Sequence, residues 1–281
     1  MIRGFYTGAS AMAARITQMD VVANNLANVN TSAFKRDETL FKSFPEMLIR
    51  RLDDDGVLSF PPGSIDRAPV VGRLGTGVEV NEVYTEHTQG TLNKTENPFD
   101  LALEGSGFFS IETPNGIRYT RNGAFSLEKN GLLVTREGYP VLGEKGHIHL
   151  KENNYFIMED GRVFINSALQ NPEQRPVQLN ENGFEESQLV DRIKLTDFPF
   201  VRYLEKEGNS FYRSTEEAGE PRFSDPSKTK ILTGFLEVSN VNAVREMVTM
   251  IEVQRAYEAS QKSVTTHDGA LDRLINQMAA V

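Results

Sequence analysis

The chain has 281 residues, enough for roughly two domains with a hydrophobic core. Its 30 Lys and Arg against 39 Asp and Glu give a net charge of −9, which disfavours binding to nucleic acid or to an anionic membrane by bulk charge. Cysteine is absent, which excludes thiol catalysis, thiolate metal sites and disulfides, and no apolar run is long enough for membrane insertion.

The first predicted element is a helix over residues 7–29, for which Thr7 is a suitable N-cap. Its apolar residues are spaced alternately by four and three positions, which is the pattern of a coiled-coil seam. The seam residues are Met12, Ile16, Met19, Ala23 and Leu26. Asn25 and Asn28 follow near the end of the helix, and two interpretations of them remain open. The helix can fray into a turn there, or the amides can pair across a helix interface and fix its register.

Residues 30–74 have no regular period. Apolar residues between positions 41 and 52 predict one short helix, and residues 53–56 predict a turn. The acidic residues at 53–55 lack the alternating spacing and the downstream Glu of a calcium-binding loop, so we expect no metal there.

From residue 77 the apolar period changes to two, which predicts short antiparallel strands. Asn-Gly pairs at 115–116, 122–123 and 130–131 separate several of these strands, and Asn-Gly is a strong hairpin signal. The predicted strands are 78–83, 108–112, 117–121, 124–127, 132–135, 139–142, 147–150, 155–158, 162–165, 193–198, 210–213 and 231–238. This part of the chain is therefore predicted to be an antiparallel β barrel or sandwich.

The last forty residues predict a second, longer helix of about 50–60 Å. Its apolar and polar seam residues are also spaced alternately by three and four positions, and this pattern continues for more than four heptads. The seam residues are Met247, Met250, Gln254, Tyr257, Gln261, Val264, Asp268, Leu271, Ile275 and Met278. No proline interrupts the helix, and only Gly269 weakens it, by about 1 kcal/mol relative to alanine.

The predicted fold is mainly β with α-helical termini. The N- and C-terminal helices pair as a coiled coil, and the centre forms the β barrel or sandwich. Residues 1–31 form the N-terminal helix of a helical domain, 32–76 an extended linker, and 77–230 the central β domain. Residues 231–281 supply the last strand and the C-terminal helix that completes the helical domain.

The sequence indicates no catalytic or cofactor site. His147 and His149 lie on one face of a predicted strand, but no third ligand completes a metal site. His267 and Asp268 lie within the helical seam, and no nucleophile elbow accompanies them. We therefore predict that the protein is not an enzyme, needs no cofactor and binds no small-molecule substrate.

The two helical seams can close in two ways. Pairing within one chain gives an ordinary monomer, whereas pairing between chains in a head-to-tail array gives a polymer if the rotation does not close a ring. The polar seam residues Gln254, Gln261 and Asp268 favour specified partners, because such residues lower stability but set register.

Three motifs, in order and together spanning nearly the whole chain, resemble those of the flagellar rod and hook protein family. The N-terminal motif is residues 18–31 (QMDVVANNLANVNT) followed by Phe34, Lys35 and Arg36. The central motif comprises residues 89–92 (QGTL), 97–105 (NPFDLALEG), 107–109 (GFF) and 119–125 (YTRNGAF). The C-terminal motif comprises residues 239–242 (SNVN), 246–248 (EMV), 250–251 (MI) and 254–258 (QRAYE). Ala33 departs from the pattern, since the family usually has glycine there, and Gly269 and Ala270 stand where bulkier residues are usual.

The resemblance implies a structural subunit of the bacterial flagellar basal-body rod. The terminal helices would form an inner tube layer with the β domain outside it, and the rod would transmit torque from motor to hook across the periplasm. Partners would be further copies, other rod and hook subunits and the flagellar export apparatus, with export needing no cleaved signal peptide. Length and the opening residues 4–10 resemble the proximal-rod member, as in spirochaetes, with the distal-rod member as the alternative.

The resemblance places the subunit interface on the helical seams and the nearby asparagines. The expected interface residues are Met12, Ile16, Met19, Ala23, Asn25, Leu26, Asn28, Met247, Met250, Gln254, Tyr257, Gln261, Val264, Leu271 and Ile275.

Two other classes of protein remain open. A secreted or surface β-domain adhesin with a helical stalk would bind a partner through residues 166–219 and would not polymerise. A cell-wall hydrolase would need paired acids in a cleft, for which Asp100, Glu104 and Glu128 are the candidates.

Overall fold

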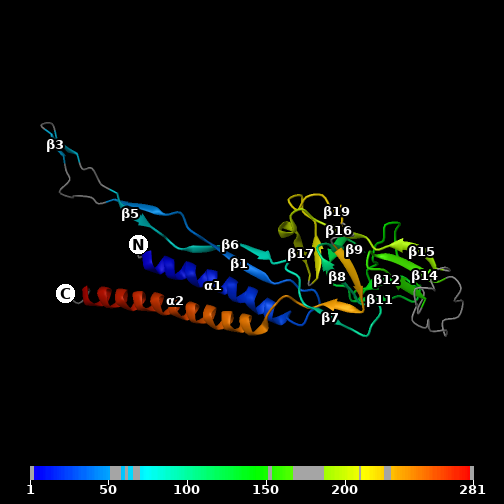
Figure 1. Cartoon of the computed structure of the whole chain (residues 1–281). Coiled ribbons are helices and arrows are strands. Elements are labelled where there is room, and N and C mark those ends of the chain that lie inside the picture. Colours follow the sequence, from blue (N-terminus) through cyan, green and yellow to red (C-terminus); the bar gives the residue numbers. More distant parts are fainter. Residues whose placement is uncertain are drawn as a thin grey trace. The chain divides into compact units, whose positions relative to one another are not determined.

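A computed structural model of the chain describes residues 3–50, 58–60, 63–65, 70–150, 154–166, 187–208, 210–224 and 229–278. The chain forms two compact units, and Figure 1 labels many of their elements. We call them the helical unit (Met1–Leu26, Asp37–Tyr84 and Ala243–Val281) and the β unit (Ala27–Arg36 and Thr85–Asn242). The chain thus passes between the units four times, and each unit is built from segments far apart in sequence.

The helical unit contains α1 (Arg3–Ala27) and α2 (Ala243–Met278), which lie side by side and run in opposite directions (Figure 1). Two glycines permit this close approach. A Cβ added at Gly8 would lie 2.6 Å from Cγ2 of Val264, and one added at Gly4 would lie 2.8 Å from Nε2 of His267. Both predicted helices are therefore confirmed, whereas their packing as a coiled coil stays a prediction. Neither described helix is long and apolar enough to cross a lipid bilayer.

The helical unit also contains six described strands, of which β1 and β2 lie where the sequence predicts a helix. The strands are β1 (Asp37–Ser43), β2 (Met47–Arg50), β3 (Leu58–Phe60), β4 (Gly63–Ile65), β5 (Val70–Leu74) and β6 (Val78–Thr85), and the last confirms the strand predicted over 78–83. β1 pairs with β6, β2 with β5 and β3 with β4. The short helix predicted between 41 and 52 is wrong, because pairing with distant strands satisfies the backbone groups of β1 and β2. Residues 53–56, with their predicted turn and the rejected calcium loop, lie outside the described residues.

The β unit is built from short strands in several sheets. The central sheet has six strands in the order β17-β18-β10-β9-β16-β19, and β13-β14-β15 form a second sheet. The remaining pairs are β11-β12, β20-β8 and β21-β7. The strands are β7 (Leu92–Lys94), β8 (Leu101–Gly105), β9 (Phe108–Thr113), β10 (Gly116–Thr120), β11 (Phe125–Leu127), β12 (Leu133–Thr135), β13 (Tyr155–Ile157), β14 (Arg162–Asn166), β15 (Ser187–Arg192), β16 (Leu195–Asp197), β17 (Glu205–Glu207), β18 (Phe211–Arg213), β19 (Arg222–Phe223), β20 (Thr229–Thr233) and β21 (Phe235–Glu237).

The predicted barrel is wrong, because none of the described sheets closes on itself. The six-stranded sheet ends at β17 on one side and at β19 on the other. The strand predicted over 231–238 is divided, since Gly234 has φ +75° and separates β20 from β21. Predicted strands 139–142 and 147–150 appear as isolated bridges rather than as continuous strands.

The β unit holds the main hydrophobic core. One cluster joins strands from the beginning, middle and end of the unit. Its buried members are Leu101, Leu103, Phe109, Ile111, Phe125, Leu133, Val141, Ile148, Leu150, Ile157, Val163, Ile193, Leu195 and Ile231. A second, aromatic cluster contains Phe108, Tyr119, Phe198, Leu204, Tyr212 and Ala218.

Candidate functional site

The predicted seam of α1 is divided between the interior and the surface. Met12, Met19 and Leu26, which are spaced by seven residues, are half-buried. Ile16 and Ala23, which form the alternate positions, are exposed, and Ile16 is 47% exposed. One half of the seam therefore serves contacts within the chain, and the other half is open.

The seam of α2 is divided in the same way. The half-buried series is Met250, Tyr257, Val264 and Leu271. The exposed series is Met247, Gln254, Gln261 and Ile275, and Asp268 is exposed as well. The alternation with a period of seven shows that only one flank of the α2 seam is covered within the chain. The side chain of Met278 lies outside the described residues.

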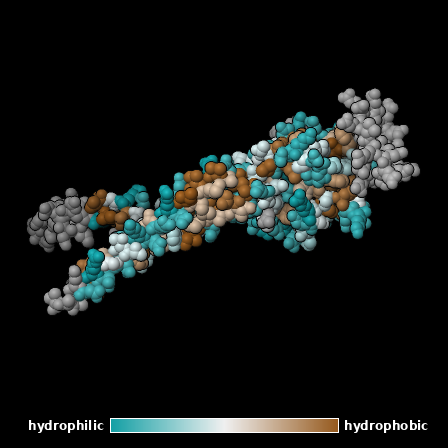
Figure 2. Space-filling model, turned by 90° about the horizontal axis from the view of Figure 1, so that it is seen from below, coloured by the Kyte–Doolittle hydropathy of each residue, from teal (hydrophilic) through white to brown (hydrophobic). Residues whose placement is uncertain are grey.

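A contiguous apolar strip covers the first two turns of α2. We call it the α2 strip and define it as Val244, Met247, Val248 and Ile251, which are 46–68% exposed. The spacing of three, four and seven residues puts these side chains on one face. The buried residues Glu246 and Val253 lie on the opposite face. Figure 2, which views the molecule from the side on which α2 lies in Figure 1, shows apolar surface gathered around these turns.

The asparagines at the end of α1 are used within the chain. Asn25 is 1% exposed, and its amide is bonded to the backbone of Asp37 in both directions. Nδ2 donates to the carbonyl of Asp37 at 2.8 Å, and Oδ1 accepts from its N–H at 2.9 Å. Asn28 accepts from the hydroxyl of Thr31 at 3.1 Å, and its carbonyl accepts from the N–H of Thr31. The turn interpretation is therefore correct for Asn28, and Asn25 fixes where β1 begins.

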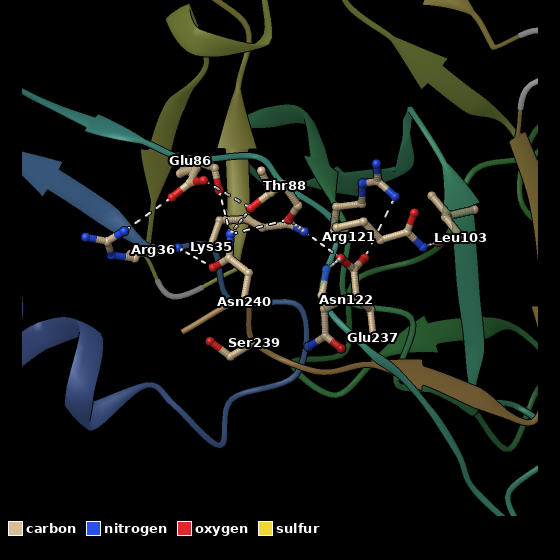
Figure 3. Close-up of polar contacts among 12 residues, drawn as sticks. Lys35, Arg36, Glu86, Thr88, Leu103, Arg121, Asn122, Glu237, Ser239 and Asn240 are labelled. Carbon is tan, nitrogen blue, oxygen red and sulfur yellow. Dashed lines mark hydrogen bonds and ion pairs between the residues drawn. The ribbon is translucent and has the colours of Figure 1, made fainter. Parts of the chain in front are cut away.

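A buried ion pair in the β unit was not predicted from the sequence. Nζ of Lys35 lies 2.5 Å from Oε1 of Glu237, and both side chains are fully buried (Figure 3). Nζ also donates to the carbonyl of Thr88 at 2.7 Å, while Oε1 accepts from the N–H of Gly90 at 2.8 Å. Segments separated by up to 202 residues thus meet at one carboxylate.

Arg121 adds a second buried cation beside this pair. Its Nη1 lies 3.8 Å from Oε2 of Glu237, and its Nη2 donates to the carbonyl of Gly105 at 2.6 Å. Burial lowers the pKa of Lys35 and that of Arg121, although the charge of Glu237 acts in the opposite direction on both. The cluster therefore depends on Glu237 to compensate charges that water does not reach.

Asn240 binds two further segments next to the ion pair (Figure 3). Its Oδ1 accepts from the N–H of Arg36, and its Nδ2 donates to the carbonyl of Glu86, both at 2.8 Å. Together with the ion pair, these contacts define the polar junction: Lys35, Arg36, Glu86, Thr88, Gly90, Arg121, Glu237 and Asn240. The junction flanks three of the four points at which the chain passes between the units.

One sequence signal could have indicated the ion pair. In the predicted strand 231–238, Glu237 lies six residues after Ile231, so both side chains point to the same face of the strand. Ile231 is apolar and marks this face as the inward one, which places the carboxylate of Glu237 in the interior. An inward charge requires a buried partner, and Lys35 lies in the N-terminal motif.

The side chains considered as metal ligands or as catalytic acids do not form a site in the described part of the chain. His147 binds Glu112 at 2.6 Å, and the described residues contain no group of three side chains suited to a metal ion. Asp100 is buried and accepts from Nδ2 of Asn97, whereas Glu104 and Glu128 are exposed.

Comparison with known proteins identifies the family. Three family signatures match: "Flagella basal body rod protein" over residues 5–35, "Flagellar hook protein FlgE/F/G D1 domain" over 102–165 and "Flagellar basal body rod FlgEFG protein C-terminal" over 232–278.

Whole-length relatives agree with these signatures. The chain is 35% identical to the flagellar basal-body rod protein FlgG of Buchnera aphidicola (subspecies Acyrthosiphon pisum) over 98% of its own length and 99% of that protein. It is 31% identical to FlgG of Borreliella burgdorferi over 96% and 97%, and 33% identical to FlgF of Caulobacter vibrioides over 93% and 92%. The chain therefore belongs to the flagellar basal-body rod FlgEFG family.

Proposed function

We propose that this structural rod subunit polymerises through its terminal helices into the periplasmic shaft that transmits torque from motor to hook. Its partners are further copies of itself and other rod and hook subunits, and it reaches the rod through the flagellar export apparatus without a cleaved signal peptide. The role is structural and requires no catalytic site or cofactor. The assignment to the proximal rather than the distal rod stays a prediction.

The divided seams carry this proposal. An apolar residue gains about 25 cal/mol per Å² when it leaves water, so exposed apolar positions at seam spacing favour burial by another helix. We propose that Ile16, Ala23, Met247 and Ile275 make contacts between subunits. The half-buried series supports the helix pair within each subunit, while Asn25 and Asn28 bind the chain that follows α1.

The substitution Ile251→Asp tests this function. Ile251 is 52% exposed in the single chain, so the carboxylate is solvated in the monomer and becomes unfavourable only when a neighbour covers it. We expect flagellated cells carrying only this variant to lose rods and motility, while the purified variant keeps the circular dichroism spectrum of the unmodified protein.

Ile251→Val is the matched control and should assemble. Normal rods containing the Ile251→Asp variant would contradict the proposal, and so would loss of the β signal in the purified variant.

A further inference from the structure

The helical unit has an apolar groove at the end opposite to the α2 strip. We call it the α1 groove. It has a volume of about 790 Å³, and the side chains that give it apolar walls are Tyr6, Phe44, Met47 and Leu74. They come from the first turns of α1, the segment between β1 and β2, the start of β2 and the end of β5. Tyr6 and Met47 are more than half exposed.

The α1 groove and the α2 strip lie at different positions along the axis of α2. Gly4 and Gly8, at the groove end of α1, face His267 and Val264 of α2. The α2 strip spans residues 244–251. The two positions are about 16 residues apart, which corresponds to about 24 Å along an α-helix. One chain therefore cannot seat its own strip in its own groove.

We propose that the α2 strip of one copy docks in the α1 groove of a second copy displaced along the helix axis. This inference rests on the proposed function, because it specifies how neighbouring subunits meet. Both surfaces are apolar, and the groove lies within the size range of pockets that enclose several side chains. A membrane is a poorer occupant, since Glu252 and Glu258 alternate with Arg255 and Lys262 along α2, whereas an interfacial helix has a polar face rich in Lys and Arg.

The contact is heterologous, and this has a consequence for assembly. Strip and groove are different surfaces, so two docked copies still present one free strip and one free groove between them. The array therefore continues instead of stopping at a dimer. The continuing contact links axial neighbours, and lateral neighbours remain free to use the exposed seam residues outside the strip, such as Ile16, Ala23 and Ile275.

Cysteine pairs test the contact directly, because the chain has no cysteine of its own. Chains with both Met47→Cys and Val248→Cys are expressed in flagellated cells as the only copy, and isolated basal bodies are oxidised and run on a denaturing gel. We expect a ladder of multimers that disappears on reduction. Each single variant should remain monomeric, because the thiols introduced at positions 47 and 248 are partners only for each other.

The control pair is Phe223→Cys with Val248→Cys. Phe223 is 69% exposed but belongs to the β unit, outside the groove. It should give at least tenfold less multimer. Rods that form normally while the Met47/Val248 pair gives no ladder, or dimers from Val248→Cys alone, would overturn the inference and leave the proposed function intact. Absence of the unmodified chain from purified rods would overturn both.

A charge exchange provides a second test that does not depend on oxidation. Val248→Glu alone and Met47→Lys alone should each reduce rod assembly at least tenfold. A chain with both substitutions should regain assembly, because each carboxylate then meets the ammonium group of the next copy. Failure of the double variant, while both single variants remain folded monomers, would count against this pairing.

Discussion

At the scale of single residues, buried charge determines the shape of the polar junction. Lys and Glu are almost never fully buried unless they are paired, and Lys35 and Glu237 are both fully buried. Removing one partner of such a pair typically costs about 3–5 kcal/mol, because the other charge is left without compensation. The pair therefore strongly disfavours any arrangement in which the segment around residue 35 separates from β21.

Ala33 shows a different residue-scale constraint. Its φ of +56° is the only positive φ of a non-glycine residue in the described part of the chain, and its side chain is 2% exposed. The left-handed conformation costs an L-residue roughly 1–2 kcal/mol. This explains why a glycine is usual there in the motif, and the N–H of Ala33, which donates to the carbonyl of Glu237, holds the strained residue in place.

His87 should make the β unit sensitive to acid. Its ring packs against Phe108 and Tyr212, and both ring nitrogens are buried without a hydrogen-bond partner among the described residues. Burial, with the positive charges of Lys35, Arg121 and Lys206, lowers its pKa from 6.5 to about 3.

As the pH falls from about 6.5 to about 3, the unfolded chain therefore binds a proton at His87 that the folded chain does not. The unfolding free energy should fall by up to about 1.4 kcal/mol per pH unit from this residue. We expect His87→Phe to remove that part of the slope between pH 6 and pH 4 in urea unfolding followed by near-ultraviolet circular dichroism. An unchanged slope would show that His87 becomes protonated in the folded state.

At the scale of elements, Asn-Gly pairs correctly predicted tight turns, because the conformation of such a turn depends on its own residues. Asn115–Gly116 does connect β9 to β10, and Asn130–Gly131 lies between β11 and β12, with φ of +100° and +79° at the two glycines. The glycine of Asn122–Gly123 is required for a different reason. A Cβ at Gly123 would lie 1.6 Å from the carbonyl oxygen of Leu101, so this glycine permits a close backbone approach that sequence spacing cannot reveal.

The elements that were missed depend on distant partners. β1 and β2 form strands because β6 and β5 pair with them, and β8 pairs with β20, more than 120 residues later. The helices were predictable because their periodicity is long and uninterrupted. Which half of each seam stays exposed was not predictable, since the spacing of three and four residues is the same for both halves.

Gly8 should limit how closely α1 and α2 can pack. Alanine has a higher helix propensity than glycine by about 1 kcal/mol, but a methyl group at position 8 would collide with Val264. We expect Gly8→Ala to destabilise the helix pair by roughly 1 kcal/mol through overpacking, measured as thermal loss of helical circular dichroism.

Two matched variants separate propensity from packing. Gly269→Ala has no atom within 4 Å of the added Cβ and should stabilise the helix by up to about 1 kcal/mol. Adding Val264→Ala to Gly8→Ala should recover part of the lost stability. If Gly8→Ala proved as stabilising as Gly269→Ala, the helices would not pack at this point.

At the scale of the whole molecule, hydrophobic burial is very unequal between the two units. In the described part of the helical unit, the buried apolar residues are Ala14, Val22 and Val253, whereas the β unit holds both core clusters. Helices gain most of their stability from packing of an apolar face. The helical unit is thus only marginally stabilised within one chain, which is what a subunit completed by its neighbours requires.

This inequality predicts two thermal transitions in the isolated subunit, with the helical unit melting first. Ile231 is 1% exposed in the β core, and Ile→Ala in such a site costs about 2–5 kcal/mol. Since about 1 kcal/mol shifts the midpoint by about 2–4 °C in a domain of 150–250 residues, Ile231→Ala should lower the upper transition by roughly 4–20 °C and leave the lower one in place. Assembly into rods should raise the lower transition, because binding stabilises only the folded form. Differential scanning calorimetry that showed one transition, shifted as a whole by Ile231→Ala, would mean that the units unfold together and that the helices do not depend on neighbours for their stability.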